Sequence, residues 1–200
     1  SGAGLSDKSG NMEAWQPYHT ANKSREWKDA AAHCSQALLL NNSERCSKCI
    51  TEETIGQLVA QPQAVAIKCY CYGKDAPKHG DLAIGEFLPE AAWVVSSRTG
   101  KPIILHMQKN RALSDPDNLS YIQTMCRKYP DAQLILAHCA RGFAAWTAVD
   151  GIRKLAGLDN IWYDLAAVCE AAPMAACILA TVGKQVLWGS DYPICMHRGR

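Results

Sequence analysis

The sequence QLILAH, at residues 133–138, is a nearly continuous apolar run that ends in a histidine. Four similar runs are separated from it and from one another by segments of helical length: 64–70 (AVAIKCY), 102–107 (PIILHM), 161–168 (IWYDLAAV) and 185–190 (QVLWGS). Runs without polar alternation are typical of parallel strands that are covered on both faces. Their alternation with helical segments predicts an α/β fold made of βαβ units.

Capping residues and glycines mark the expected helices between these runs. Asp81 can begin a helix that runs toward Arg98 and stops near Gly100. Asp115 precedes a proline suited to the first helical position, and this helix should end before Tyr129. Three further helices are expected at residues 51–60, 143–156 and 172–182.

The first 63 residues carry weaker signals. Residues 1–25 are polar and rich in Gly and Ser, and predict a loop or disordered lead-in. Residues 26–38 can form a helix, and residues 37–40 can belong to a short strand. The sequence thus predicts one domain over residues 26–200.

The number of strands bears on the architecture. Five clear strands and one doubtful strand do not close an eight-stranded barrel, which typically takes about 250 residues. The sequence begins without methionine and ends at Arg200, with no helix expected after the last run. We therefore expect an incomplete (β/α)8 TIM-type barrel that lacks its first strands and its C-terminal end.

Composition excludes several classes of partner. The chain has 200 residues, 48% of them hydrophobic, and its 21 basic and 19 acidic residues give a net charge of +2. These charges are spread along the sequence, so no basic stripe indicates nucleic acid. No apolar stretch approaches the roughly 20 residues of a membrane helix, and no secretory signal is visible.

The chain contains ten cysteines. Six of them lie in apolar strand or helix patterns, where a free thiol behaves as a small hydrophobe. A chain of this length needs no disulfides, so we expect free thiols and a cytoplasmic location. Cys46 and Cys49 form one CxxC pair, which is open to a zinc or redox role, although ordinary thiols are the favoured interpretation.

Three side chains of metal-ligand type end or follow the predicted strands. His106 and His138 lie at the ends of two runs, and Asp191 directly follows the last run. The carboxyl ends of parallel barrel strands converge on one face, where the active sites of this architecture lie. One such histidine is more often a satisfied core residue, but three ligand-type residues at equivalent positions favour a site. Imidazole nitrogens and a carboxylate oxygen suit zinc or a similar divalent ion.

Four segments, in this order, resemble the amidohydrolase-related metal-dependent hydrolases, a branch that also contains nonoxidative decarboxylases. They are PIILHM (102–107), YPDAQLILAHCARGF (129–143), NIWYDLAAV (160–168) and VLWGSDYP (186–193). Each segment alone is a weak motif, and their order and spacing together are specific. The resemblance covers about residues 64–197.

The resemblance implies roles for the three residues. His106 matches the fifth-strand histidine that binds the metal, and His138 matches the sixth-strand histidine that binds a second metal or contacts the substrate. Asp191 matches the eighth-strand aspartate that takes a proton from the metal-activated water and often contacts the metal itself. The family's first-strand His-x-His pair has no counterpart here, because His19, His33 and His79 are isolated.

Further candidates surround these positions. Lys68 corresponds to a fourth-strand lysine that bridges two metals in some relatives, although an ion pair is the more common role of such a lysine. Arg141 suits a substrate carboxylate, or is a solvated loop residue. Asp164 is expected to orient neighbouring groups rather than bind metal. Tyr192 and His197 are substrate-pocket candidates, or ordinary loop residues.

These features together predict a metal-dependent hydrolase that uses zinc or a similar divalent ion. Its substrate would be a small polar molecule, carboxylated or cyclic, and a homo-oligomer is left open. A nonoxidative decarboxylase is the chemical alternative. A non-catalytic fragment or a small doubly wound binding module is the alternative of another class, although no Gly-rich phosphate loop supports the latter.

Overall fold

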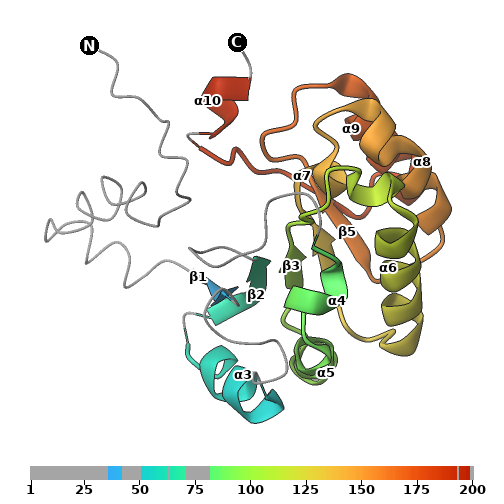
Figure 1. The fold of residues 1–200 in the computed structure, drawn as a ribbon. Coiled ribbons are helices and arrows are strands. Elements are labelled where there is room, and N and C mark those ends of the chain that lie inside the picture. Colours follow the sequence, from blue (N-terminus) through green and yellow to red (C-terminus); the bar gives the residue numbers. More distant parts are fainter. Residues whose placement is uncertain (1–35, 42–50, 63, 71–81, 193, 199–200) are drawn as a thin grey trace, which may run out of the picture.

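The computed structural model describes residues 36–41, 51–62, 64–70, 82–192 and 194–198, which build one parallel sheet with helices packed along it (Figure 1). The sheet has six strands in the order β1-β2-β3-β4-β5-β6, and every neighbouring pair is parallel. The strands are β1 (Gln36–Asn41), β2 (Ala64–Tyr70), β3 (Ile103–Leu105), β4 (Leu134–Leu136), β5 (Ile161–Asp164) and β6 (Val186–Leu187). The predicted lead-in over 1–25 lies outside the described residues.

Helical segments connect the strands. They are α3 (Glu52–Val59), α4 (Ile84–Phe87), α5 (Glu90–Thr99), the 3-10 turn η3 (Ala112–Ser114), α6 (Pro116–Lys128), α7 (Ala137–Arg141), α8 (Ala145–Leu155), α9 (Ala171–Thr181) and α10 (Ile194–Arg198). Parallel strands in sequence order with helices between them are the arrangement of a (β/α)8 barrel. The predicted incomplete barrel is confirmed, since the described strands form an open sheet.

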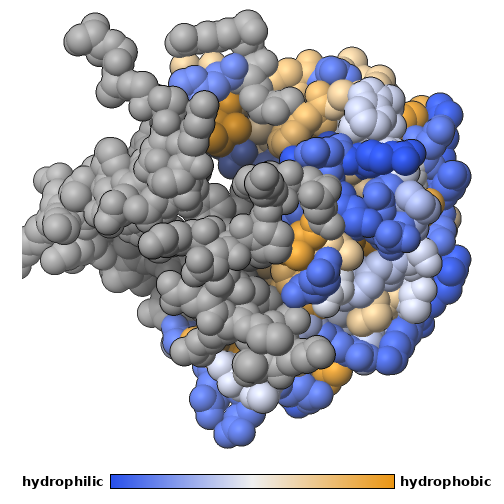
Figure 2. All heavy atoms as spheres, in the orientation of Figure 1, coloured by the Kyte–Doolittle hydropathy of each residue, from blue (hydrophilic) through white to orange (hydrophobic). Residues whose placement is uncertain are grey.

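One face of the sheet builds the hydrophobic core against the helices. The side chains that alternate onto this face are no more than 2% exposed; they are Ile67, Cys69, Ile103, Leu105, Leu134, Leu136, Ile161 and Tyr163. Trp93 of α5 and Ile122 of α6 are fully buried in the same cluster. Each such side chain stabilises the fold by roughly 1.5–3 kcal/mol. The outer surface over α6 is mainly hydrophilic (Figure 2), as expected for helices that cover a barrel.

The opposite face corresponds to the inside of a barrel. Register places Lys68, Ile104, Ile135 and Trp162 at one level across four strands. These side chains are only partly buried. A hollow of about 270 Å³ opens beside them and is lined by Gly100, Pro102, Gln133, Ile135, Trp162 and Leu187.

Most predicted helix ends are confirmed by their caps. The Asp115 carboxylate accepts hydrogen bonds from the amide N–H groups of Asp117 and Asn118, and Pro116 begins α6. The Thr51 hydroxyl caps α3 in the same way, through the N–H of Thr54. Gly100, with φ of 70°, ends α5 in the left-handed region that glycine tolerates best.

Some predicted boundaries are wrong. The predicted helix start, Asp81, lies outside the described residues. The stretch from there to Arg98 holds two helices, α4 and α5, because Pro89 interrupts it and adopts the extended conformation of an N-cap. The strand expected over 161–168 ends at Asp164, and Ala167 has a φ of 54°. The last strand has two residues, and α10 follows it where no helix was expected. Residues 36–38 belong to β1 and not to the helix proposed for 26–38.

The cysteines in the described part of the chain are free thiols: Cys69, Cys126, Cys139, Cys169, Cys177 and Cys195. Burial raises the pKa of the Cys69 thiol to about 12, so this thiol stays protonated and inert. The CxxC pair, Cys46 and Cys49, lies outside the described residues. None of the described helices has the length and apolar character needed to cross a bilayer.

Candidate active site

His106 and His138 meet at the carboxyl ends of two neighbouring strands. His106 follows the last residue of β3, and His138 comes two residues after β4. Nδ1 of His106 lies 3.1 Å from Nε2 of His138, and the two rings are inclined at 76° with centroids 5.0 Å apart. The predicted convergence of strand ends therefore places these two imidazoles in direct contact.

The hydrogen bonds of His138 define its tautomer. Its Nδ1 lies 2.8 Å from the carbonyl oxygen of Ala166. A carbonyl only accepts, so Nδ1 carries the proton in the neutral ring and Nε2 carries a lone pair. The His138 side chain is 8% exposed, and its ring also packs against Phe143, with centroids 5.1 Å apart. The lone pair on Nε2 thus faces His106.

An unusual backbone conformation aims His138. With regular strand alternation, His138 would share the face of Leu134 and Leu136, which are buried beneath the helices. Instead, α7 departs from right-handed geometry, with φ of 59°, 50°, 60° and 58° at the four residues 138–141. Residues other than glycine seldom adopt this conformation, which costs roughly 1–2 kcal/mol each. The turn redirects the imidazole toward His106.

Two aspartates lie next to His138. Oδ2 of Asp191 is 4.0 Å from Nδ1 of His138, and the Asp191 side chain is 37% exposed. Asp191 also has a left-handed backbone, with φ of 53°. Oδ1 of Asp164, at the end of β5, accepts hydrogen bonds from the backbone N–H groups of His138 and Ala166 at 2.9 and 3.0 Å. Strained backbone of this kind gathers at functional sites.

Lys68 of β2 contributes charge to this face. Burial lowers the pKa of its ammonium group, while the carboxylates of Asp164 and Asp191 act in the opposite direction. The charge of Lys68 is thus felt by both aspartates, and register places Lys68 on the barrel side of the sheet with Ile104. Its predicted role in bridging two metals stays a prediction.

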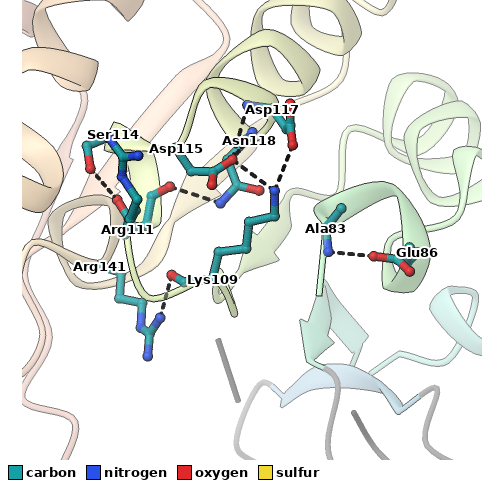
Figure 3. A network of polar contacts seen from close by, with 10 residues as sticks. Ala83, Glu86, Lys109, Arg111, Ser114, Asp115, Asp117, Asn118 and Arg141 are labelled. Carbon is teal, nitrogen blue, oxygen red and sulfur yellow. Dashed lines mark hydrogen bonds and ion pairs between the residues drawn. The ribbon is translucent and has the colours of Figure 1, made fainter. Parts of the chain in front are cut away.

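Arg141 is held by the loop that follows β3. Its Nη1 donates hydrogen bonds to the carbonyl oxygens of Gln108 and Lys109, at 2.8 and 2.7 Å. Figure 3 shows the guanidinium beside the main chain of Lys109, whose own ammonium lies between Asp115 and Asp117. These contacts tie the turn after β4 to the loop after His106. A contact between Arg141 and a substrate stays a prediction.

Tyr192 and His197 lie at the rim beyond Asp191. Tyr192 is 69% exposed, and its backbone N–H donates to the Ser190 hydroxyl at 3.3 Å. His197 is exposed on α10. Both are accessible to a molecule from solvent, and their substrate roles stay predictions.

The site contains two groups that inspection of ligand-type side chains misses. The Ala166 carbonyl has no side-chain signature, because any residue at that position would present it. Phe143 packs on the His138 ring. The sequence pattern marks Phe143 only as the start of a predicted helix, and that helix begins at Ala145 instead. The five-residue spacing between His138 and Phe143 only weakly indicates a contact between the two rings, and the contact becomes evident only from the structure.

The donor set fits a divalent ion in part. Two nitrogens that bind a tetrahedral ion at roughly 2.0–2.1 Å are about 3.3 Å apart, and His106 Nδ1 and His138 Nε2 are 3.1 Å apart. The Ala166 carbonyl holds the remaining His138 nitrogen, as outer partners of metal-binding histidines do. Among the described residues, however, His, Cys, Asp and Glu form no ready-made group of three or more metal ligands.

A partial parallel barrel with histidines and an aspartate at its carboxyl ends has these side chains on the face where barrel enzymes of this architecture build their active sites. The amidohydrolase family model matches residues 55–200, and the chain belongs to that family. No curated protein sequence matches the chain.

Several solved structures are similar in fold. A 2,6-dihydroxybenzoate decarboxylase from Rhizobium is 14% identical, with 94% of this chain and 70% of that chain covered and a TM-score of 0.52. A dihydroorotase from Saccharomyces cerevisiae is 13% identical, with coverages of 90% and 57% and a TM-score of 0.52. An amidohydrolase 2 from Bifidobacterium longum subsp. infantis is 19% identical, with coverages of 72% and 62% and a TM-score of 0.44. The chain thus spans between 57% and 70% of the length of these three structures.

Proposed function

We propose that this chain carries part of the active site of a metal-dependent hydrolase that acts on a small polar substrate. The observation that carries the proposal is the contact between His106 Nδ1 and His138 Nε2, with the Asp191 carboxylate 4.0 Å from the other His138 nitrogen. These groups lie at the strand ends where barrel enzymes build their sites. Family membership supports the same class of chemistry.

His106, His138 and Asp191 each have a role in this proposal. His106 and His138 would hold zinc or a similar divalent ion, with Asp191 as a further ligand-type group at the rim. A bound ion of this kind polarises the scissile bond and lowers the pKa of a water molecule. Asp191, which is partly exposed, accepts a proton from the attacking water and delivers it to the leaving group.

The substrate class follows from the charges that surround the site. Lys68 is a cation whose charge interacts with Asp164 and Asp191, while Asp164 is engaged with two backbone N–H groups. A lysine at this depth favours an anionic group, so a carboxylated or cyclic polar substrate is consistent with it.

A nonoxidative decarboxylase is the second candidate, and the partly buried Lys68 ammonium also favours it, since a lysine there can hold a substrate carboxylate. The two structures with a TM-score of 0.52 are a decarboxylase and a dihydroorotase, so the fold alone does not separate the two chemistries. The third alternative, a non-catalytic fragment or binding module, differs from both enzymes in that it would show neither hydrolysis nor decarboxylation.

The test follows products from two probes, in the longest polypeptide encoded around this sequence and loaded with zinc. A cyclic amide that carries a carboxylate reports hydrolysis by ring opening, and 2,6-dihydroxybenzoate reports decarboxylation by release of CO2. Ring opening without CO2 supports the hydrolase. Release of CO2 alone contradicts it in favour of the decarboxylase. Stoichiometric zinc with neither product contradicts both and favours a non-catalytic role.

A further inference from the structure

The turn that carries His138 needs an external support. Residues 138–141 hold four successive left-handed conformations, and no glycine is among them. Such a turn persists only where the surrounding structure determines it, because an isolated chain would relax to right-handed or extended geometry. The contacts made by both ends of the turn therefore decide where the imidazole points.

A single carboxylate oxygen supports the first end of this turn. Oδ1 of Asp164 accepts the N–H of His138 at 2.9 Å and the N–H of Ala166 at 3.0 Å. The carbonyl of Ala166 in turn lies 2.8 Å from Nδ1 of His138. Both partners of the bond between the ring and this carbonyl are thus anchored to the same atom. The other end is tied to the loop after β3 by Arg141.

We propose that Asp164 is a positioning residue that sets the aim and the tautomer of His138. By fixing Ala166, it presents a carbonyl that only Nδ1–H can satisfy, and this leaves the lone pair of Nε2 directed at His106. The positive charge of Lys68 interacts favourably with the Asp164 carboxylate. This assignment rests on the proposed function only in saying that Nε2 of His138 binds a metal ion. The tautomer of His138 does not depend on that function.

The experiment compares Asp164→Ala and Asp164→Asn with the unchanged chain, and Asp150→Asn is the matched control. Asp150 is an exposed aspartate on α8 whose ion pair with Arg153 spans 3.8 Å. Long-range proton–nitrogen NMR correlation reports the tautomer at about pH 8, where an unperturbed imidazole is neutral. His138→Gln identifies the resonances. Zinc titration gives the affinity as a second readout.

In the unchanged chain we expect the Nδ1–H tautomer at His138. Asp164→Ala should yield a mixture of tautomers and a zinc affinity about 10- to 100-fold lower, the usual effect of losing an outer partner of a ligand. Asp164→Asn retains an acceptor oxygen and should keep the tautomer, while the amide protons of His138 and Ala166 both move upfield because a neutral acceptor is weaker.

Three results would overturn the proposal. One is an Asp164→Ala protein with an unchanged tautomer and zinc affinity. The other two apply even if that variant does not fold: an Asp164→Asn protein in which neither amide proton moves, and an Asp164→Asn protein in which the tautomer is lost. None of these NMR readouts depends on turnover, so an inactive parent enzyme would contradict the proposed function and leave this assignment standing.

Discussion

His138 lies between two groups with different surroundings. Nδ1 of His106 faces its Nε2 at 3.1 Å, and His106 is partly buried. The Asp191 carboxylate is 4.0 Å from its Nδ1, with a side chain that is 37% exposed. A nitrogen that faces a second imidazole can share an ion with it, whereas an exposed carboxylate can exchange protons with water or substrate. Substitutions at the two positions should therefore have different effects.

His106→Ala should abolish turnover in the full-length enzyme through loss of metal, with the fold retained. Asp191→Asn should keep much of the metal and reduce kcat by roughly 10² to 10⁴, the usual contribution of a general base. Metal content and kcat measured on the same preparations separate the two effects. Asp150→Asn, on the exposed surface of α8, should change neither quantity. Stoichiometric metal in folded His106→Ala protein would remove His106 from the ligand set.

At the level of elements, the first turn of α6 is held by a network of hydrogen bonds and ion pairs. The Asp115 carboxylate caps the helix and pairs with Lys109, whose ammonium also reaches Asp117 (Figure 3). Asp115→Ala removes the cap and should lower the free energy of unfolding by about 1–2 kcal/mol. Urea denaturation measures this loss. Asp131→Ala, at an exposed position before β4, is the matched control and should have little effect.

The same carboxylate predicts a dependence of stability on pH. Burial raises the pKa of Asp115, but hydrogen bonds from Lys109 and from the N–H of Asn118 outweigh it and hold the pKa below its ordinary value of 3.8. The ionised form therefore stabilises the fold above pH 3.8, and this contribution is lost as the pH falls through the lowered pKa. Unfolding measured from pH 7 to pH 2 should show a smaller acid loss in Asp115→Asn than in the unchanged chain.

Two helical glycines should respond in opposite ways to substitution by alanine. A Cβ at Gly151 of α8 would meet Leu113, 2.4 Å from Cγ and 2.7 Å from the carbonyl oxygen. Gly151→Ala should therefore destabilise the fold by about 1–3 kcal/mol, despite the better helix propensity of alanine. At Gly56 of α3 the nearest atom is 3.5 Å away, so Gly56→Ala should stabilise by up to about 1 kcal/mol. Equal melting temperatures for both variants would contradict the close packing of α8 on η3.

Local signals explain which elements were predictable from the sequence. Strand β2 and the cap of α6 follow from an apolar run and from an Asp-Pro pair, which act within a few residues. The break at Pro89 was also visible in the sequence, since proline cannot continue a helix interior. The turn at residues 138–141 was not, because its causes, Asp164 and the loop after β3, lie far away in the sequence.

The site shows the same contrast between features with local sequence signals and features that depend on distant residues. The meeting of His106 and His138 follows from their strand-end positions, because parallel strands bring equivalent positions to one edge. The tautomer of His138 depends on a backbone carbonyl of Ala166, which no residue type reveals. Sequence therefore predicts which groups gather, and the tertiary structure defines how each one is oriented.

At the scale of the whole molecule, the described sheet has two open edges, at β1 and β6. Its barrel face carries partly buried Ile104, Ile135 and Trp162, which a closed ring would enclose. The described strands also bring together two imidazoles and one carboxylate, and the carboxylate lies 4.0 Å from Nδ1 of His138, the nitrogen that does not contact His106. The number of metal ligands on these strands is therefore small for a catalytic site.

A catalytic zinc site normally has three protein ligands and a water molecule. Two imidazole nitrogens in contact, with Asp191 oxygen 4.0 Å from the opposite nitrogen of His138, make a weaker set. The 200-residue chain should therefore bind zinc weakly and show little hydrolase activity. A version that adds upstream coding sequence with a strand-ending His-x-His should bind at least about 100-fold more tightly, since a direct ligand contributes more than the 10- to 100-fold of an outer partner.

Calorimetric titration with zinc, together with turnover, on both versions tests this prediction. His106→Ala in the longer version should return the affinity toward that of the short chain, because it removes one of the nitrogens that share the ion. Cys169→Ser, at an exposed thiol, controls for zinc bound by surface cysteines. Tight stoichiometric zinc with full activity in the 200 residues alone would show that the ligand set proposed for His106, His138 and Asp191 is wrong.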